Sequence, residues 1–398
     1  MADIDDAWYR LDKATGKRVP TGRHGTGKRW LARWSDGGRQ RKKSFDKKGD
    51  AERFLVQVQA DQSRGLYVDP ALGRTTVTEY AERWRGEQLH RDTTADRLER
   101  VFRLHVDPVL GHLPLAQVRS GHVQAWVKAK SAELSPSTLR VTYSNLAQMF
   151  HRAAVDRPIG VSPCTGIRLP DVDRHDLVIP TPEQVHALAE ALPAHYAAVP
   201  YVAAATGLRG GELFGLELGA VDFLRRVLDV RQQLQVLAGR KPYLAQVKTK
   251  TSRRVVELPE TAALALARHL ERFGGEVELD DETDQRRPAR RTARLVFTNA
   301  IGGAVHRASW SHVWAPAVAA AGLPARFGLH GLRDFYATSL IHAGASVKTV
   351  QGALGHATPT ITLNTYVGEW PEAVDRTRAI LDAALGVPRI CHDGQAAE

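Results

Sequence analysis

The segment Thr206-Gly207-Leu208-Arg209-Gly210-Gly211-Glu212 is the first of four short motifs that dominate the interpretation of this chain. Three others follow it in order: Val247-Lys248-Thr249-Lys250, then His330-Gly331-Leu332-Arg333, then Leu354-Gly355-His356 with Tyr366 ten residues further on. Taken singly, each also fits a structural role, such as a surface arginine at a helix start or a tyrosine packed on a helix. His330 and Arg333, three residues apart, would share one helix face.

In this order the motifs resemble the tyrosine recombinase family of phage integrases and Xer-type resolvases, whose pattern is Arg, Lys, His-x-x-Arg, His or Trp, then Tyr. All six positions are filled, by Arg209, Lys248, His330, Arg333, His356 and Tyr366. The match runs from about Thr181 to Tyr366, and the ending Leu363-Asn364-Thr365-Tyr366 is similar to actinobacterial phage-type integrases. The resemblance implies a site-specific recombinase that cuts and rejoins DNA through a 3′-phosphotyrosine, without ATP.

The chemistry of these residue types agrees with that implication. A tyrosine that stays attached to the phosphate conserves the bond energy of the cut strand, but its pKa near 10 means that it needs help to lose its proton. Arg209 and Arg333 suit the phosphate, because guanidinium groups bind its oxygens bidentately and stay charged. Glu212, one turn after Arg209, is predicted to orient that guanidinium. The two histidines can donate to phosphate oxygens or accept the tyrosine proton.

Lys248 has a different predicted role. The departing 5′ oxygen needs a proton, which an ammonium group releases and a guanidinium group does not. Lysines are scarce beyond residue 170, and the pattern of Lys-Thr followed by Ser-x-Arg favours Lys248 as the acid. Lys250 is the competitor for this role, and it is otherwise a DNA-contacting lysine.

Three features depart from the family pattern. The spacing from His356 to Tyr366 is one residue longer than in many members, and Asp334 follows Arg333 where histidine is common. Residues 274–294 are polar and highly charged, which predicts an exposed loop or insertion. No carboxylate cluster of the kind that holds magnesium accompanies the motifs, so we expect metal-independent chemistry and no cofactor. Cys164 and Cys391 form no metal-ligand pattern.

The 398 residues are too many for one ordinary domain, and the predicted fold is multidomain. We expect a catalytic domain over residues 177–385, mainly helical with a small antiparallel sheet, and a C-terminal tail over 386–398. Its three strand-like runs are Arg226–Val230, Tyr243–Lys248 and Arg253–Leu258. Before it, residues 74–169 predict an all-helical domain of four amphipathic helices, which the resemblance implies is the SAM-like core-binding domain.

Residues 1–65 predict a small β-sheet followed by a helix, after which Asp69-Pro70-Ala71-Leu72-Gly73 looks like a linker. Two strand-like runs, Lys28–Trp34 and Arg39–Phe45, flank the turn Ser35-Asp36-Gly37-Gly38, and a further strand is predicted at Trp8–Leu11. Between Lys17 and Lys43 lie ten Lys or Arg and one acidic residue. The resemblance implies an arm-type DNA-binding domain, and the DNA contacts that we predict for it are Arg29, Arg33, Arg39, Arg41, Lys42 and Lys43.

Fifty-five basic residues against forty-four acidic ones leave a net charge of +11, which favours a polyanionic partner. The expected partner is double-stranded DNA, bound by a homotetramer with a host DNA-bending protein and an excision factor. No apolar stretch is long enough to span a membrane, and no secretory signal is apparent, so we expect a cytoplasmic, nucleoid-associated protein. Two alternatives stay open: a Xer-like resolvase or transposon recombinase, and a non-catalytic DNA-binding protein.

Overall fold

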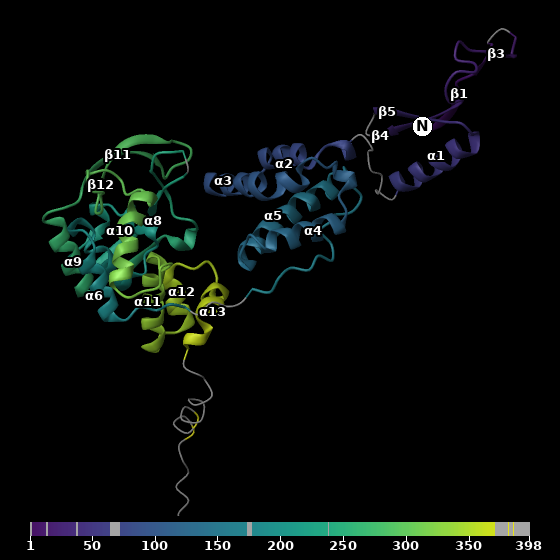
Figure 1. Cartoon of the computed structure of the whole chain (residues 1–398). Helices are drawn as coiled ribbons and strands as arrows, with labels where there is room; N and C mark the ends of the chain where they lie inside the picture. The colour runs from purple at the N-terminus through teal and green to yellow at the C-terminus, as the bar shows by residue number, and fades with distance from the viewer. Residues whose placement is uncertain are drawn as a thin grey trace, which may run out of the picture. The chain divides into compact units, whose positions relative to one another are not determined.

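The computed structural model describes residues 2–12, 15–36, 39–63, 72–172, 177–237 and 239–370, together with Leu381 and Leu385 (Figure 1). Contacts divide the chain into two compact units, Met1–Arg174 and His175–Glu398. A further division near residue 65 stays a prediction. No helix in the described ranges has both the length and the apolar character that crossing a membrane requires.

The first unit begins with a three-stranded antiparallel sheet in the order β1-β4-β5, formed by β1 (Asp3–Asp6), β4 (Trp30–Asp36) and β5 (Arg39–Phe45). Helix α1 (Lys48–Ser63) covers one face, where Ala32 and Trp34 pack against Leu55 and Val58. The predicted pair of strands and the helix are therefore confirmed. Gly37 and Gly38 of the predicted turn lie outside the described residues.

A second hairpin, β2 (Tyr9–Leu11) with β3 (Arg18–Pro20), contains the predicted strand near Trp8; β1 and β3 were not predicted. Beside it Arg29, one of the predicted DNA contacts, donates to Asp6, with Nη2 2.9 Å from Oδ2. Its guanidinium also lies over the rings of Trp8, Tyr9 and Trp30. The cause is the carboxylate at the end of β1, which the strand pairing brings to Arg29 and which no local pattern reveals.

The rest of the first unit is helical, as predicted. The turn Leu72–Arg74, at the end of the predicted linker, is a single 3₁₀ turn, and residues 64–71 are outside the described ranges. Pro136 occupies the first turn of its helix and Ser135 caps it, as the sequence indicates. A π-helical segment continues the second helix and contains Pro108, whose missing N–H cannot complete an α-helical bond. The elements are α2 (Val77–Gly86), α3 (Asp92–Val101), the π segment (Phe102–Gly111), α4 (Ser120–Ser131) and α5 (Pro136–Val155).

The second unit packs eight described helices around two small sheets (Figure 1). Thr181 caps the first helix, and Pro182 occupies its first turn. The helices are α6 (Pro182–Ala191), α7 (Val199–Thr206), α8 (Gly210–Phe214), α9 (Glu260–Leu270), α10 (Arg307–Ala320), α11 (Leu329–His342), α12 (Val347–Leu354) and α13 (Pro359–Tyr366).

The sheets correct the prediction of one small antiparallel sheet. The first has the order β10-β7-β6 and the second the order β12-β11-β9-β8, in which β11 pairs with β9 in parallel. The three predicted strand runs are found as β7, β9 and β10, and the others were missed. The strands are β6 (Val221–Asp222), β7 (Val227–Val230), β8 (Gln232–Gln235), β9 (Tyr243–Gln246), β10 (Arg254–Glu257), β11 (Gly275–Glu282) and β12 (Ala289–Leu295).

The prediction of an exposed loop over residues 274–294 is wrong. This stretch forms the antiparallel hairpin of β11 and β12, and one face of it is buried through Val277, Leu279, Ala293 and Leu295. The charged residues between them lie on the other positions of the strands, because successive side chains in a strand point to opposite faces. The high charge of this segment therefore made a half-buried hairpin look like an exposed loop in the sequence.

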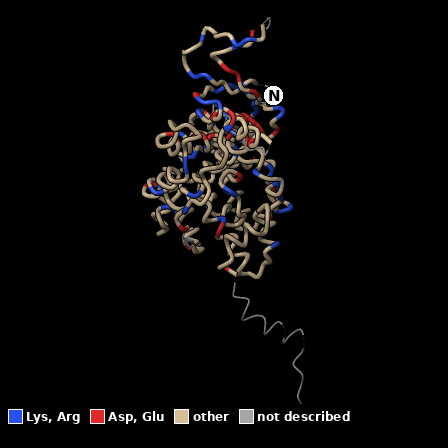
Figure 2. The backbone as a smooth tube through the Cα atoms, turned by 90° about the vertical axis from the view of Figure 1, so that its right-hand side faces the viewer, with Lys and Arg blue, Asp and Glu red and all other residues tan. Residues whose placement is uncertain are grey.

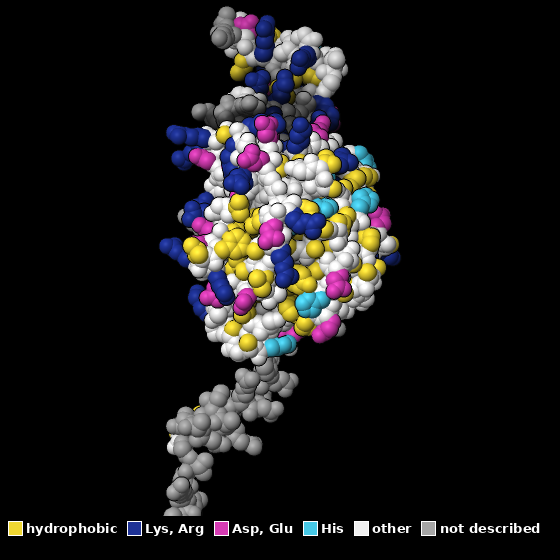
Figure 3. All heavy atoms as spheres, turned by 90° about the vertical axis from the view of Figure 1, so that its left-hand side faces the viewer, with side chains coloured by type: hydrophobic (Ala, Val, Ile, Leu, Met, Phe, Trp, Pro, Cys, Tyr) yellow, Lys and Arg dark blue, Asp and Glu magenta, His cyan; other side chains and the backbone are white. Residues whose placement is uncertain are grey.

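Figure 3 shows basic and acidic side chains interspersed over most of the face that it draws, whereas basic side chains predominate in its uppermost part. In the N-terminal region, Figure 2 shows Lys and Arg following the strands together with several acidic residues. The charge that a sequence count assigns to one basic cluster is thus partly neutralised inside the fold.

Candidate active site

A left-handed glycine places the first motif. Gly207 ends α7 with φ of 61°, and a Cβ on it would lie 2.4 Å from the ring of Tyr336, so only glycine fits this turn. The chain then enters α8 with Arg209 as the residue before the helix. The Arg209 backbone N–H donates to Glu212 Oε2 at 3.0 Å, and Arg209 Nη1 donates to Glu212 Oε1 at 2.8 Å. The predicted contact between these two residues is present.

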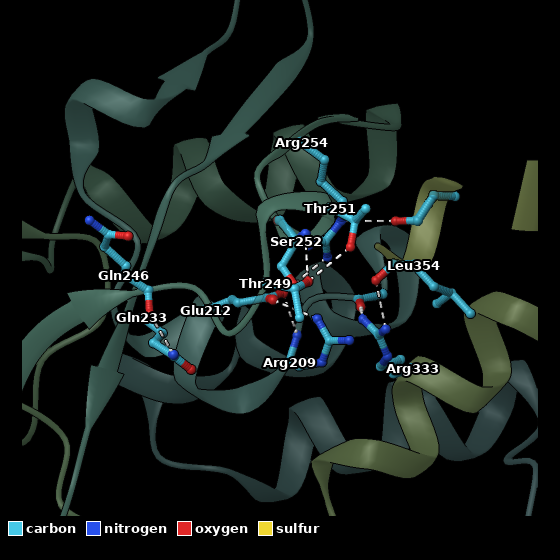
Figure 4. A network of polar contacts seen from close by, with 12 residues as sticks. Arg209, Glu212, Gln233, Gln246, Thr249, Thr251, Ser252, Arg254, Arg333 and Leu354 are labelled. Carbon is cyan, nitrogen blue, oxygen red and sulfur yellow. Dashed lines mark hydrogen bonds and ion pairs between the residues drawn. The ribbon is translucent and has the colours of Figure 1, made fainter. Parts of the chain in front are cut away.

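Glu212 has a second cationic partner that the sequence analysis did not single out. Arg254, on β10, donates from Nη2 to Glu212 Oε2 at 3.0 Å, and its Nε donates to the carbonyl of Ala353 at 2.9 Å. Figure 4 shows this network, which joins Arg254 of β10 to Glu212 of α8. Burial raises the pKa of the Glu212 carboxyl, but Arg254 and Arg209 outweigh it, and the net pKa is lowered. Arg254 is the arginine of the Ser-x-Arg pattern, which was a usable signal.

Arg333 connects three of the four motifs. Its side chain is completely buried on α11, where Nη1 donates to the carbonyl of Gly207 at 2.5 Å and Nη2 donates to that of Leu354 at 2.7 Å. Figure 4 shows Arg209 and Arg333 extending into the same region of the site. Burial, and then the charge of Arg209, lower the pKa of Arg333 to about 10. The two guanidinium groups therefore repel each other, and the neighbouring negative charges do not fully offset this repulsion.

His356 follows Gly355, a second left-handed glycine with φ of 65° that ends α12. Its side chain is 9% exposed, and Nδ1 lies 2.8 Å from Thr362 Oγ1 on α13. Burial, followed by the charges of Arg333 and Arg209, lowers the pKa of His356 to about 4. The imidazole is therefore neutral at pH 7, and Thr362 fixes the orientation of its ring.

Tyr366 is the last residue of α13, and its side chain is only 1% exposed. The ring packs in an apolar cluster with Ile341, Val350 and Leu354. Its hydroxyl donates to Asp334 Oδ1 at 2.7 Å. Burial, and then this hydrogen bond, raise the pKa of Tyr366.

His330 lies at the edge of this group. It occupies α11 one turn before Asp334, and its side chain is 69% exposed, with Nε2 3.9 Å from Asp334 Oδ1. That separation is too long for a hydrogen bond. His330 is thus open to a bound phosphate, whereas Arg333, His356 and Tyr366 are buried.

Lys248 lies in the connection between β9 and β10, and its side chain is exposed. The connection is a compact turn in which Ser252 N–H donates to the carbonyl of Thr249, and the two hydroxyl groups lie 2.8 Å apart. Within the described residues, no hydrogen bond or ion pair ties the Lys248 ammonium to the buried cluster. The side chain of Lys250 is outside the described part of the chain.

The predicted DNA contacts of the N-terminal sheet lie on two faces. Arg33 and Lys42 are cross-strand neighbours on the face away from α1, and Arg33 forms an ion pair with Asp5 at 2.6 Å. Arg41 and Lys43 pair with Trp34 and Ala32 on the helix side, where the Lys43 ammonium lies over the rings of Phe45 and Phe54. The Arg39 side chain is outside the described part.

Among the described residues, no group of three or more His, Cys, Asp or Glu is arranged to hold a metal ion. Independence from metal stays a prediction.

Comparisons with known proteins decide the family. Residues 181–371 match the model described as the phage integrase family, and residues 76–131 match the one described as the phage integrase N-terminal SAM-like domain. The chain belongs to the phage integrase family. It is a site-specific tyrosine recombinase.

Relatives of this integrase-family chain include the integrase of Mycobacterium phage L5, which is 26% identical over 80% of this chain and 84% of that protein. A XerC-like tyrosine recombinase of Caldanaerobacter subterraneus is 28% identical over 62% of this chain and 65% of that protein.

Among solved structures, the Tn1549 transposon integrase in complex with a circular intermediate DNA has a TM-score of 0.66 at 23% identity, covering 78% of this chain and 99% of that one. A lambda integrase dimer bound to a core site has a TM-score of 0.57 at 16% identity, covering 84% and 91%. These likenesses show the tyrosine recombinase catalytic fold with a SAM-like helical region before it.

We predict that His356 makes the stability of the second unit depend on pH. Its folded pKa of about 4 lies below the ordinary value of 6.5, so the unfolded chain binds the extra proton below pH 6.5 and stability falls as the pH drops toward 4. At pH 5 the loss is about 2 kcal/mol. Calorimetry of the full chain should show a shallower fall of Tm between pH 7 and 5 for His356→Gln than for the parent.

The matched control is His312→Gln, at an exposed position of α10. It should keep the parent's dependence of Tm on pH. An unchanged pH dependence in His356→Gln would contradict the buried neutral imidazole.

Proposed function

We propose that this recombinase is the integrase of a phage or integrative element, and that Tyr366 attacks a DNA phosphate to form a 3′-phosphotyrosine. The observation that carries the proposal is the buried Arg333 guanidinium, which hydrogen-bonds the carbonyls of Gly207 and Leu354 and lies close to Arg209. These hydrogen bonds bring the motif of His356 and Tyr366 next to the motifs of Arg209 and Arg333.

Catalysis of phosphoryl transfer depends mainly on position and fixed positive charge. Arg209 and Arg333 provide that charge for the non-bridging oxygens, and Glu212 with Arg254 fixes the position of Arg209. The exposed His330 and the Thr362-bound His356 are the further donors to the phosphate.

Lys248 is the proposed acid that protonates the leaving 5′ oxygen. Its exposure on the turn between β9 and β10 allows the side chain to follow the bound strand. Lys250 remains the alternative, and otherwise contacts DNA.

The proposed partner is double-stranded DNA at attachment sites, recombined by a homotetramer with a host DNA-bending protein and an excision factor. Support comes from similar folds described as a lambda integrase tetramer bound to a Holliday junction and as a Tn1549 integrase bound to circular intermediate DNA. We assign residues 1–65 to arm sites, 74–169 to the core site and 177–385 to catalysis, followed by the tail 386–398. Two DNA-binding parts in one chain gain avidity when both sites are held.

A Xer-like resolvase or a transposon recombinase is the second candidate, because a XerC-like recombinase and a transposon integrase are among the similar proteins. The N-terminal sheet with its basic open face favours the phage-type assignment.

We predict that a nicked half-site substrate traps a covalent complex through Tyr366. The complex should form in EDTA and be absent from Tyr366→Phe, because the phenol oxygen is the atom that forms the bond to phosphorus. Tyr336→Phe on α11 is the control and should still form it. The readout is a DNA-linked band on denaturing gels; an adduct in Tyr366→Phe, or strict dependence on added magnesium, contradicts the assignment.

We predict that Lys248→Ala slows cleavage about 100-fold or more, the usual contribution of a general acid. A substrate with a bridging 5′ sulfur should restore the rate, because a thiolate leaves without a proton. Single-turnover cleavage of the two substrates measures the rescue. Arg209→Ala is the control and should not be rescued, and selective rescue of Lys250→Ala would transfer the role to Lys250.

We predict that Arg33→Ala with Lys42→Ala weakens protection of arm sites and leaves the core site protected. The two residues are neighbours on the open face of the sheet. Loss of two phosphate contacts should reduce the slope of log K for arm binding against log salt concentration by about two. Footprinting of the DNA that flanks the gene, at several salt concentrations, measures both sites. Arg53→Ala, an exposed change on α1, should alter neither; equal loss at the core site would overturn the division.

A further inference from the structure

The nucleophile proposed above contacts a carboxylate that the family pattern does not include. Tyr366 Oη donates to Asp334 Oδ1 at 2.7 Å, and both side chains are buried, with 1% and 7% of their surface exposed. A candidate base must lie within hydrogen-bond reach of the proton that it removes. Asp334 meets this requirement in the DNA-free chain.

The other groups of the site are engaged elsewhere. The Glu212 carboxylate is bound by Arg209 and Arg254. His356 uses Nδ1 for Thr362, and among the described contacts neither histidine is hydrogen-bonded to the phenol. His330 is exposed and lies 3.9 Å from the carboxylate instead.

We infer that Asp334 is a further catalytic residue, which takes the proton of Tyr366 during strand cleavage and returns it during rejoining. As the Tyr366 oxygen forms its bond to phosphorus, its O–H bond breaks and the proton moves to Asp334 Oδ1, while the 5′ oxygen leaves with a proton from the acid. Rejoining reverses each step, so protons and charge balance over the cycle. The inference rests on the proposed function of Tyr366.

The fold keeps this base beside the phosphate. Asp334 follows Arg333 on α11, a helix of 14 residues, so the carboxylate and the phosphate-binding guanidinium belong to one rigid element. Tyr366 is carried by the separate eight-residue helix α13 and must become accessible to DNA. Wherever it meets a phosphate held by Arg333, the carboxylate of the next residue remains close.

The carboxylate also favours the protonated form of the Tyr366 phenol in the free chain. Burial and the neighbouring negative charge both raise the pKa of Tyr366, so a phenolate is not formed in advance. The proton can leave only when the oxygen's negative charge is being shared with phosphorus, which is the condition under which a general base is effective.

The test combines Asp334→Asn with fluorinated tyrosines at position 366 of the full chain, whose phenols lose their proton more readily. Asparagine keeps an oxygen acceptor at the same place but cannot take a proton. On the nicked half-site, single-turnover cleavage by Asp334→Asn should fall about 100-fold with natural tyrosine. The deficit should shrink with each added fluorine, which a merely structural role would not cause.

Cleavage by Asp334→Asn at the parent rate, or a deficit that fluorination leaves unchanged, would overturn the inference. The absence of any Tyr366 adduct in the parent chain would instead refute the proposed function. Thermal unfolding and core-site binding show whether the variant is folded. If the variant is not folded, the cleavage rates of the parent chain with the fluorinated tyrosines provide the test. A nearly constant cleavage rate supports proton transfer to Asp334. A cleavage rate that rises with each added fluorine overturns the inference.

Discussion

A buried guanidinium needs hydrogen-bond acceptors, and the site is organised around meeting that need for Arg333. Transfer of an unpaired charge from water to the interior costs several kcal/mol, about the whole stability of many domains. The acceptors are two backbone carbonyls, those of Gly207 and Leu354, and each lies where a helix ends at a left-handed glycine. The ends of α7 and α12 are therefore held to the middle of α11, and Arg209 and His356, which lie two residues after these two carbonyls, are placed as a consequence.

The second buried charge, Glu212, has a similar effect on the connection between β9 and β10 that carries Lys248. Its two oxygens accept from Arg209 and from Arg254, and Arg254 also reaches the carbonyl of Ala353, next to the acceptor of Arg333. Without Arg254, the buried Glu212 carboxylate would keep Arg209 as its cationic partner but lose the second one. This loss would lower the stability of the fold more than the loss of a surface ion pair does. A residue outside the family's list of reacting groups thus ties α8, β10 and the end of α12 together.

Sequence alone predicted the groups that lie in contiguous motifs, because helix caps, glycine ends and the Arg-x-x-Glu spacing are local. Local signals could not give the partners that the tertiary fold supplies. Arg29 looked like a free cation until strand pairing placed Asp6 beside it. The β11–β12 hairpin looked like a loop because cross-strand pairs such as Arg290 with Glu278 fill its exposed face with charge. The contact of Asp334 with Tyr366 joins residues 32 apart, and the sequence marked Asp334 only as an unusual neighbour of Arg333.

The charged groups of the buried network sum to a small positive charge. Arg209, Arg254 and Arg333 contribute three positive charges, while Glu212 and Asp334 contribute two negative ones, and His356 is neutral at pH 7 because its pKa is lowered to about 4. The balance is one positive charge, and a phosphodiester carries one negative charge. Burial and the charge of Arg209 lower the pKa of Arg333 to about 10. A phosphate placed between the two guanidinium groups would remove this repulsion, so binding and the ordering of the site favour each other by linkage. In the proposed mechanism, the positive charge that destabilises the free site is the charge that stabilises the transition state.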